Sequence, residues 1–499
     1  MKLLRLFGYA VGTVGLVASI SAGTLPYVIV DTGQVRCYDN SREVAYTSAA
    51  ERFYGQDAQF AGRAPSYRDN CDGTVSDLVT GLMWTRDPGA KKSYGNAVSG
   101  ASACRIAKKT DWRLPTIKEL YSLIKFNGVD PDPMRSSDSN QTPFIDISVF
   151  KFQYGDQKDG DRIIDSQFAT STKYVSTTMG GNETMFGVNF ADGRIKGYPS
   201  LDRRHGGQKK FCVLYVRGNK AYGLNDFNDN GDGTITDVAT GLTWTQSDSG
   251  KGMNWEDALN YAEDMKLAGY SDWRLPNAKE LQSIVDYTRS PDITDSAAID
   301  PMFKTTSIVN ELNIKDYPAY WTGTTHVRAG GKASAAVYVA FGRAMGCMHG
   351  RWMDVHGAGC QRSDPKEGDP ADYPKDRGPQ GDAIRILNYV RCVRGGTADL
   401  RISGPTVEAP SVQKKKCVKR DMILPLAWRT SSNPIRNNVE RPPVGSCDDW
   451  ITMEMAKYPN RNLTVHHNIS VISTVTAMDT YPKKKLLLDR HRVGKVDSI

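Results

Sequence analysis

The spacing of hydrophobic residues predicts two helices in one half of the chain and a matching pair in the other. Apolar side chains recur at helical intervals at Trp255, Ala258, Leu259, Ala262 and Met265. The corresponding upstream set is Tyr94, Ala97, Val98, Ala101 and Cys104. A second helix is expected further along each half, at Leu120, Leu123 and Ile124 and at Leu281, Ile284 and Val285. The same helical pattern therefore occurs twice in the same order.

Short apolar segments between turn residues predict strands around these helices. A strand meander is expected over residues 69–85, and residues 229–245 repeat it, with Asn, Asp and Gly at the turns. Later strands are expected at 174–177, 186–194, 211–217, 320–324, 337–343 and 389–394. Strands and helices together predict an α+β fold.

One decapeptide occurs in both halves and indicates a duplicated domain. It reads DWRLPTIKEL at 111–120 and DWRLPNAKEL at 272–281, and a Thr-Gly-Leu-x-Trp segment precedes each copy. After the proline, Thr116 with Glu119 and Asn277 with Glu280 match a helix capping box. We interpret the motif as structural, with tryptophan core anchors and arginines paired to carboxylates. The residues with this role are Trp84, Trp112, Arg113, Glu119, Trp244, Trp273, Arg274 and Glu280.

The N-terminus has the pattern of a secretory signal peptide, which we assign to residues 1–22. Lys2 and Arg5 precede an apolar segment from Leu6 to Ile20, and small residues follow. We expect an exported protein that is periplasmic, secreted or on the cell surface. The alternative is that the signal peptide is not cleaved, in which case it would anchor the protein to a membrane. The predicted division is a lead-in at 23–66, repeats at 67–217 and 225–396, and a flexible basic tail at 397–499.

Charge and cysteine usage narrow the choice of partners. The formal net charge is +8, and the whole excess of positive charge lies after residue 400. Because the repeats are formally neutral, no nucleic-acid partner is expected.

There are nine cysteines, and export permits disulfides, although an odd number leaves at least one thiol unpaired within the chain. Only Cys212 and Cys392 occupy matching positions when the repeats are aligned by sequence. The disulfide pattern is therefore not shared between the repeats.

Two segments have the spacing of metal ligands, although each has a simpler explanation. Cys347 and Cys360 enclose a Gly-rich loop and are predicted to form a disulfide, with zinc at His349 and His356 as the weaker alternative. Asp226, Asn228, Asn230 and Asp237 match a calcium loop, but the first repeat lacks these ligands and a hairpin turn explains both copies. We expect no metal and no cofactor, with calcium as the alternative.

No recognised catalytic motif occurs in the sequence. It has no His-Glu-x-x-His, no Gly-x-Ser-x-Gly, no phosphate-binding loop and no dinucleotide fingerprint. His326 stands alone and is expected to be structural, and the Asp-Pro-Asp-Pro segment at 130–133 is interpreted as a turn. We therefore predict that the protein is not an enzyme.

The ordered set of motifs resembles a bacterial family called DUF1566, or the Lcl C-terminal domain family. The matching segments are 229–237, 240–244, 269–276, 320–325 and 390–394, and both repeats carry the set. The resemblance implies two tandem C-type-lectin-like domains, a fold shared with formylglycine-generating enzymes. For the collagen-like adhesin that gives the family its name, it implies binding of sulfated polysaccharides at the cell surface.

The leading hypothesis is an exported or cell-surface binding module that recognises a glycan or another extracellular polymer, including polyanions. Its predicted contacts lie in the loop from Gly342 to Asp382, at Arg351, Trp352 and Asp354. One alternative is a metal-binding or oxidase-like enzyme centred on the loop between Cys347 and Cys360. The other is a purely structural envelope protein. The sequence does not predict an oligomeric state.

Overall fold

The computed structural model describes residues 25–133, 141–201, 206–373, 380–396, 400–401 and 411–414. The predicted signal peptide at 1–22 and nearly all of the predicted tail at 397–499 lie outside these residues. Within the tail, two short strands are described, and they pair with strands of the lead-in and of the first repeat. No helix in the described part of the chain is long and apolar enough to cross a membrane.

The predicted α+β class is wrong, because the described chain is mostly β: 32% of it is strand and 12% helix. The helices are short: α1 (Tyr94–Ala103), α2 (Ile117–Tyr121), α3 (Trp255–Glu263), α4 (Ala278–Ser283) and the 3-10 turns η1 (Asp57–Gln59), η2 (Ile106–Lys108), η3 (Gln157–Asp159) and η4 (Pro370–Asp372). Leu123 and Ile124 are buried as the pattern requires, but they follow α2 outside the helix. Helical spacing over two turns therefore predicted burial correctly and helix length incorrectly.

Each repeat contains one small sheet of four antiparallel strands built around a fully buried tryptophan. In the first repeat, the order is β13 (Val216–Gly218), β6 (Leu82–Thr85), β5 (Thr74–Asp77) and β4 (Ser66–Asp69), and β26 (Ser411–Lys414) joins β4 in parallel as a fifth strand. In the second, it is β24 (Val393–Gly395), β16 (Leu242–Thr245), β15 (Thr234–Asp237) and β14 (Phe227–Asp229). Trp84 pairs with Val216 and Trp244 with Val393, so these two pairs are equivalent.

This equivalence corrects the sequence alignment of the cysteines. Because Val216 corresponds to Val393, the counterpart of Cys392 is Tyr215, and not Cys212. The backbone agrees, since the Thr85 amide donates to the Tyr215 carbonyl (2.9 Å) and the Thr245 amide to that of Cys392 (3.0 Å). The short Cys-Val match misled the alignment because the repeats differ in length before this strand. The repeats therefore share no cysteine position here.

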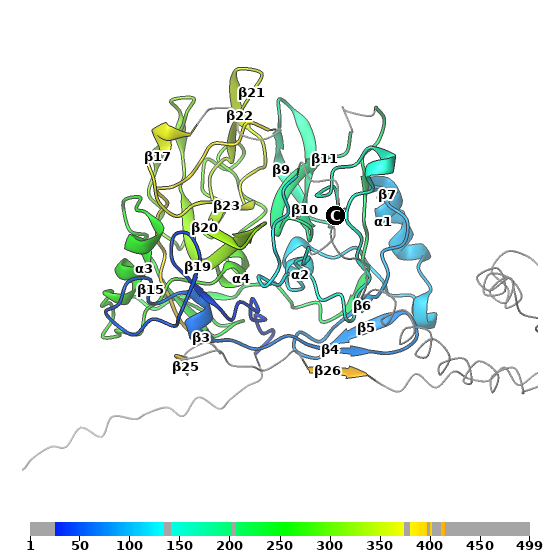
Figure 1. Cartoon of the computed structure of the whole chain (residues 1–499), viewed down its shortest axis with the longest axis horizontal. Coiled ribbons are helices and arrows are strands. Elements are labelled where there is room, and N and C mark those ends of the chain that lie inside the picture. The colour runs from blue at the N-terminus through cyan, green and yellow to red at the C-terminus, as the bar shows by residue number, and fades with distance from the viewer. Residues whose placement is uncertain are drawn as a thin grey trace, which may run out of the picture. The chain divides into compact units, whose positions relative to one another are not determined.

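A seven-stranded sheet runs through both repeats (Figure 1). The second repeat contributes β19 (Ala319–Arg328), β20 (Lys332–Ala340) and β23 (Gln361–Pro365); the first contributes β11 (Arg194–Pro199), β10 (Asn182–Asn189), β9 (Lys173–Thr178) and β8 (Gln167–Phe168). The junction is the antiparallel contact of β11 with β23, where Ile195 pairs with Gln361. The largest core cluster likewise includes both Trp84 and Trp244.

Two lysines, the half-buried Lys118 and the buried Lys279, link the two repeats through reciprocal contacts. Lys118 on α2 donates to the Ser283 carbonyl (2.6 Å), and its counterpart Lys279 on α4 donates to the Ser122 carbonyl (2.8 Å). Burial lowers the pKa of Lys118 to about 8 and that of Lys279 to about 7. Each repeat thus gives the other the same contact, which is the pattern of a two-fold symmetric interface.

The lead-in packs against the second repeat. Gln34 exchanges hydrogen bonds with the backbone of Thr325, donating at 2.7 Å and accepting at 2.8 Å. The buried Asp57 carboxyl accepts from Thr32 (2.7 Å) and from Thr324 (2.6 Å). The remaining strands are short: β1 (Cys37–Tyr38), β2 (Glu43–Val44), β3 (Phe60–Ala61), β7 (Lys92–Ser93), β12 (Lys210–Phe211), β17 (Ile308–Val309), β18 (Lys315–Asp316), β21 (Met345–Met348), β22 (Arg351–Asp354), β25 (Leu400–Arg401) and β26 (Ser411–Lys414).

Both copies of the decapeptide form a capping box and an arginine–glutamate pair. Glu280 accepts from the Asn277 amide (2.9 Å) and receives two hydrogen bonds from Arg274, both at 2.7 Å. Glu119 likewise accepts from the Thr116 amide (2.9 Å), but it receives only one hydrogen bond from Arg113 in the described structure. The side chain of Arg274 is 3% exposed, whereas that of Arg113 is 28% exposed. The four tryptophans of the motif are all buried.

This difference in exposure predicts unequal effects of the same substitution. Glu280→Gln keeps an oxygen for the Asn277 amide but removes the charge that faces buried Arg274, so it should lower the free energy of unfolding by about 3 kcal/mol. Glu119→Gln, the matched control, should cost about 1 kcal/mol because water reaches Arg113. Urea unfolding measures both. Equal losses would contradict the burial argument.

Candidate functional site

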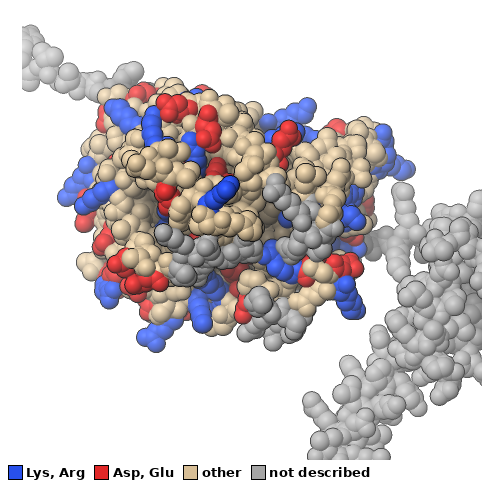
Figure 2. All heavy atoms as spheres, turned by 90° about the horizontal axis from the view of Figure 1, so that it is seen from above, with Lys and Arg blue, Asp and Glu red and all other residues tan. Residues whose placement is uncertain are grey.

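A cleft of about 920 Å³ lies where the two repeats meet. Its walls include β10 and β11 of the first repeat and β20 and β23 of the second. Seven basic side chains line it, namely Arg162, Arg194, Lys196, Lys209, Arg328, Lys332 and Arg362, with five acidic ones, Asp130, Asp132, Asp192, Asp364 and Asp382. Figure 2 views the molecule from the end where β21 and β22 lie, and basic and acidic side chains intermingle there.

The floor of the cleft is one face of the seven-stranded sheet. Side chains alternate between the two faces of a strand, so Arg194 and Lys196 point away from the buried Ile195. Arg362 likewise points away from its buried neighbour Gln361. The pairing of Ile195 with Gln361 therefore places basic groups from both repeats on the same face.

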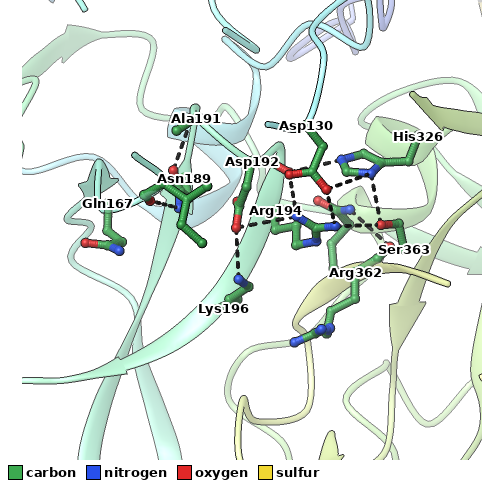
Figure 3. A network of polar contacts seen from close by, with 12 residues as sticks. Asp130, Gln167, Asn189, Ala191, Asp192, Arg194, Lys196, His326, Arg362 and Ser363 are labelled. Carbon is green, nitrogen blue, oxygen red and sulfur yellow. Dashed lines mark hydrogen bonds and ion pairs between the residues drawn. The ribbon is translucent and has the colours of Figure 1, made fainter. Parts of the chain in front are cut away.

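The floor contains a network of polar contacts around Arg194 (Figure 3). The Arg194 guanidinium donates to Asp130 (2.7 Å) and to the Ser363 hydroxyl (3.0 Å). Asp130 was interpreted as a turn residue; its side chain is in fact buried and pairs with this arginine across 64 residues of sequence. The turn interpretation of that residue is incomplete, because local sequence cannot show which cation a distant strand will bring.

His326 completes this network in its neutral form. One ring nitrogen, Nε2, lies 3.0 Å from the Asp192 carbonyl oxygen, which can only accept, so Nε2 carries the proton. The other, Nδ1, then accepts from Ser363 (3.0 Å). Burial lowers the pKa of His326 well below its usual value, and its ring stacks on Phe144. These contacts give His326 a structural role.

Two further cations of the floor are each held by an aspartate. Lys196 donates to Asp192 (2.9 Å), and burial lowers the pKa of this lysine. Arg362 donates to Asp382, which also accepts from His356 (2.9 Å). Burial opposes ionisation of Asp382, but Arg362, His356 and Lys196 together outweigh it and hold the pKa of the carboxyl well below its usual value. The aspartates thus fix the cations in place before any ligand arrives.

Several polar atoms of the cleft have no hydrogen-bond partner within the described residues. They are Nε and Nη1 of Arg362, Nδ1 of His356, Oδ1 of Asp192 and the Tyr198 hydroxyl. Buried polar groups are normally paired, so such a concentration marks a place where another molecule can supply partners. The set includes donors and acceptors, which matches a ligand that carries both anionic and hydroxyl groups.

The three predicted ligand contacts lie on β22 and do not line this cleft. Arg351 is exposed and Trp352 half-buried, and a binding role for either stays a prediction. Asp354 is buried, and its carboxylate accepts from the amides of Ala344 (3.2 Å) and Gly357 (2.8 Å) and from the Tyr174 hydroxyl (2.9 Å). Asp354 therefore secures the base of the β21–β22 hairpin.

The loop that carries the cysteine and histidine pairs does not assemble a metal site or a disulfide. No disulfide joins Cys347, on β21, to Cys360, which is a buried free thiol before β23. His349 is exposed in the hairpin turn, whereas His356 is buried beyond the far end of β22. In the residues that the structure describes, no group of three or more His, Cys, Asp or Glu side chains is arranged to hold a metal.

The predicted calcium-loop residues form a hairpin. Asn230 donates to Thr234 and accepts from Asn228, at 2.9 and 3.0 Å, while Asp237 accepts from the Asp226 amide (2.9 Å). The first repeat folds the same way, although Cys71 replaces Gly231 at a left-handed position, with φ 60° against 75°. The turn explains both copies, and calcium at this loop stays an untested alternative.

The sequence does not predict the cleft, because no motif links its residues; Asp130 and His356 stand out in the sequence only through unrelated patterns. The cleft residues come from the turn after residue 129, from β11, from β19 and from the segment between 356 and 382. The one available signal was length: the second repeat has a long segment between Phe341 and Tyr389 that the first repeat lacks. That segment supplies Arg362 and Asp382.

Comparison with known proteins gives one match. The model of a family described as the Lcl C-terminal domain matches residues 73–217 and 233–354, which is more than half of the chain. No curated protein and no solved structure matches. The tandem arrangement is thus shown at the level of the family. The C-type-lectin-like fold and the relation to formylglycine-generating enzymes find no support among solved structures.

The buried His356 predicts how stability depends on pH. Burial lowers its pKa to about 4, so the fold favours the neutral ring, and this stability is lost as the pH falls from about 6.5 to about 4. His356→Gln keeps a donor for Asp382 but does not titrate. Relative to that variant, the wild type should lose about 3 kcal/mol of unfolding free energy between pH 7 and pH 4. Urea unfolding across this range tests it, and parallel pH profiles would contradict it.

Proposed function

Because the chain belongs to the Lcl C-terminal domain family, we propose that it is an exported or cell-surface binding module that recognises an acidic glycan or a similar extracellular polyanion. Family membership itself indicates an extracellular or surface-associated module. The choice of ligand rests on one observation, the cleft between the repeats with its excess of basic over acidic side chains.

The chemistry of the cleft favours an anionic ligand rich in hydroxyl groups. Buried cations held by aspartates offer charge-assisted hydrogen bonds without the entropy cost of ordering long side chains. Side-chain amides of Gln167, Asn182 and Asn189 and the ring of Tyr198 also line the walls. Amide, aromatic and guanidinium groups together suit a saccharide with carboxylate or sulfate substituents better than an apolar ligand.

Binding is a better account of the cleft than catalysis. The one serine–histidine contact on the floor uses the Ser363 hydroxyl twice, since it donates to His326 and accepts from Arg194. His326 is fully buried, and its lowered pKa makes it a weak base. A positioned base near the operating pH is what general base catalysis requires. We therefore propose a protein that holds its ligand without transforming it.

Affinity electrophoresis in gels that contain polysaccharide tests this function on the full chain. Polygalacturonate or dextran sulfate should retard migration, and retardation should weaken as salt increases, whereas neutral dextran should not retard it. Lys332 lies exposed at the cleft, so Lys332→Glu should weaken binding by about tenfold. Lys251→Glu, an equal charge change at an exposed site away from the cleft, should change it by less than about twofold.

Three results would count against the proposal. Retardation by neutral dextran equal to that by the anionic polymers would remove the role of charge. Equal effects of the two lysine substitutions would show that general surface charge, and not the cleft, attracts the polymer. Failure to bind any polysaccharide would favour a purely structural envelope protein.

A further inference from the structure

We infer that Lys196 and Arg362 form a single anion-binding site that both repeats share, so that each chain binds one acidic saccharide and not one per repeat. The inference rests on the proposed function and specifies the stoichiometry and the contact residues of its site. A tandem repeat by itself suggests two equivalent sites; the junction of the sheet argues for one.

The sheet junction lies on a local two-fold axis. In the first repeat, Val188 pairs with Ile195 on the next strand; in the second, the equivalent Val339 pairs with Gln361. Ile195 and Gln361 are therefore equivalent positions. They also pair with each other across the antiparallel junction of β11 and β23. Equivalent residues that face one another across antiparallel strands must flank a two-fold axis.

Lys196 and Arg362 are related by this axis, because Lys196 directly follows Ile195 and Arg362 directly follows Gln361. Both point to the cleft face of the sheet, and both line the cleft. In antiparallel strands, positions with this diagonal relation lie about 7–8 Å apart. One saccharide unit is of similar size, so a single ligand can contact both cations at once. Two ligands would meet at the axis and repel each other.

Arg362 and Asp192, the aspartate that holds Lys196, keep capacity for a ligand. The aspartate partner of Arg362, Asp382, occupies one terminal nitrogen, while Nε and Nη1 have no partner in the described structure. Oδ2 of Asp192 accepts from Lys196, and its Oδ1 has no partner there. An oxyanion on the floor would give the guanidinium edge its missing partner beside the Lys196 ammonium, and a neighbouring hydroxyl would do the same for Oδ1 of Asp192. That set matches an acidic saccharide.

The β21–β22 hairpin makes the shared site asymmetric. It occurs in the second repeat and rests on β9 of the first; the amide of Met179, the residue directly after β9, donates to the Asp354 carbonyl (2.8 Å). Met348 of the hairpin and Met179 both line the cleft. The equivalent connection in the first repeat is the short turn at 190–193. A wall on one side of the axis favours one direction of a polar saccharide chain.

Isothermal titration calorimetry of the full chain tests the shared site. The probes are hexagalacturonate, which carries only carboxylates, and sulfated maltohexaose, which carries only sulfate esters; the one that binds identifies the source of the oxyanion. The wild type should bind one hexasaccharide per chain. Lys196→Gln and Arg362→Gln should each weaken affinity by about tenfold while the stoichiometry stays at one. Lys251→Gln, a control away from the cleft, should leave affinity within about twofold.

The outcomes separate the shared site from the proposed function. Two hexasaccharides per wild-type chain, with each cleft variant losing one of them and keeping the other at full affinity, would overturn the shared site and leave the binding function intact. No binding of either probe would overturn the proposed acidic ligand and the shared site with it. The stoichiometry of the wild type is measured without any substitution. It therefore distinguishes one shared site from two separate sites even if a cleft variant fails to fold.

Discussion

The structure depends on the antiparallel contact of β11 with β23, which turns two repeats into one sheet. A duplicated domain usually buries its own core and meets its copy through a polar surface. Here the copies share a core cluster and exchange reciprocal hydrogen bonds through Lys118 and Lys279. Desolvated lysines are costly, and they are tolerated because each ammonium reaches a carbonyl of the opposite repeat.

The same contact creates the cleft and decides its chemistry. Pairing Ile195 with Gln361 carries the basic residues on either side to one face. Those charges must be compensated, and Asp130, Asp192 and Asp382 do so at hydrogen-bond distance. The compensation stabilises the free protein and also orients the cations, which lowers the entropy cost of binding. A site of this kind exists in neither repeat alone.

The sequence predicts the features that local chemistry determines. The duplication, both capping boxes and the buried Trp84 and Trp244 follow from short patterns that act within a few residues. Features set over long distances differ from the prediction: the second helix of each repeat is shorter than expected, and the strands are more numerous. The cleft could not be predicted, because Arg194 meets Asp130 only through the fold. The misalignment of Cys392 arose in the same way, since strand pairing and not residue identity fixes its counterpart.

The measurement that tests the account most directly is hydrogen exchange by mass spectrometry on the full chain in low denaturant. If the repeats form one cooperative body, the amides of β5–β6 in the first repeat and of β15–β16 in the second should open together, with the same free energy and the same dependence on denaturant. Lys279→Met should lower both values equally. Different opening energies, with the substitution affecting only the second repeat, would contradict a shared core and a shared cleft.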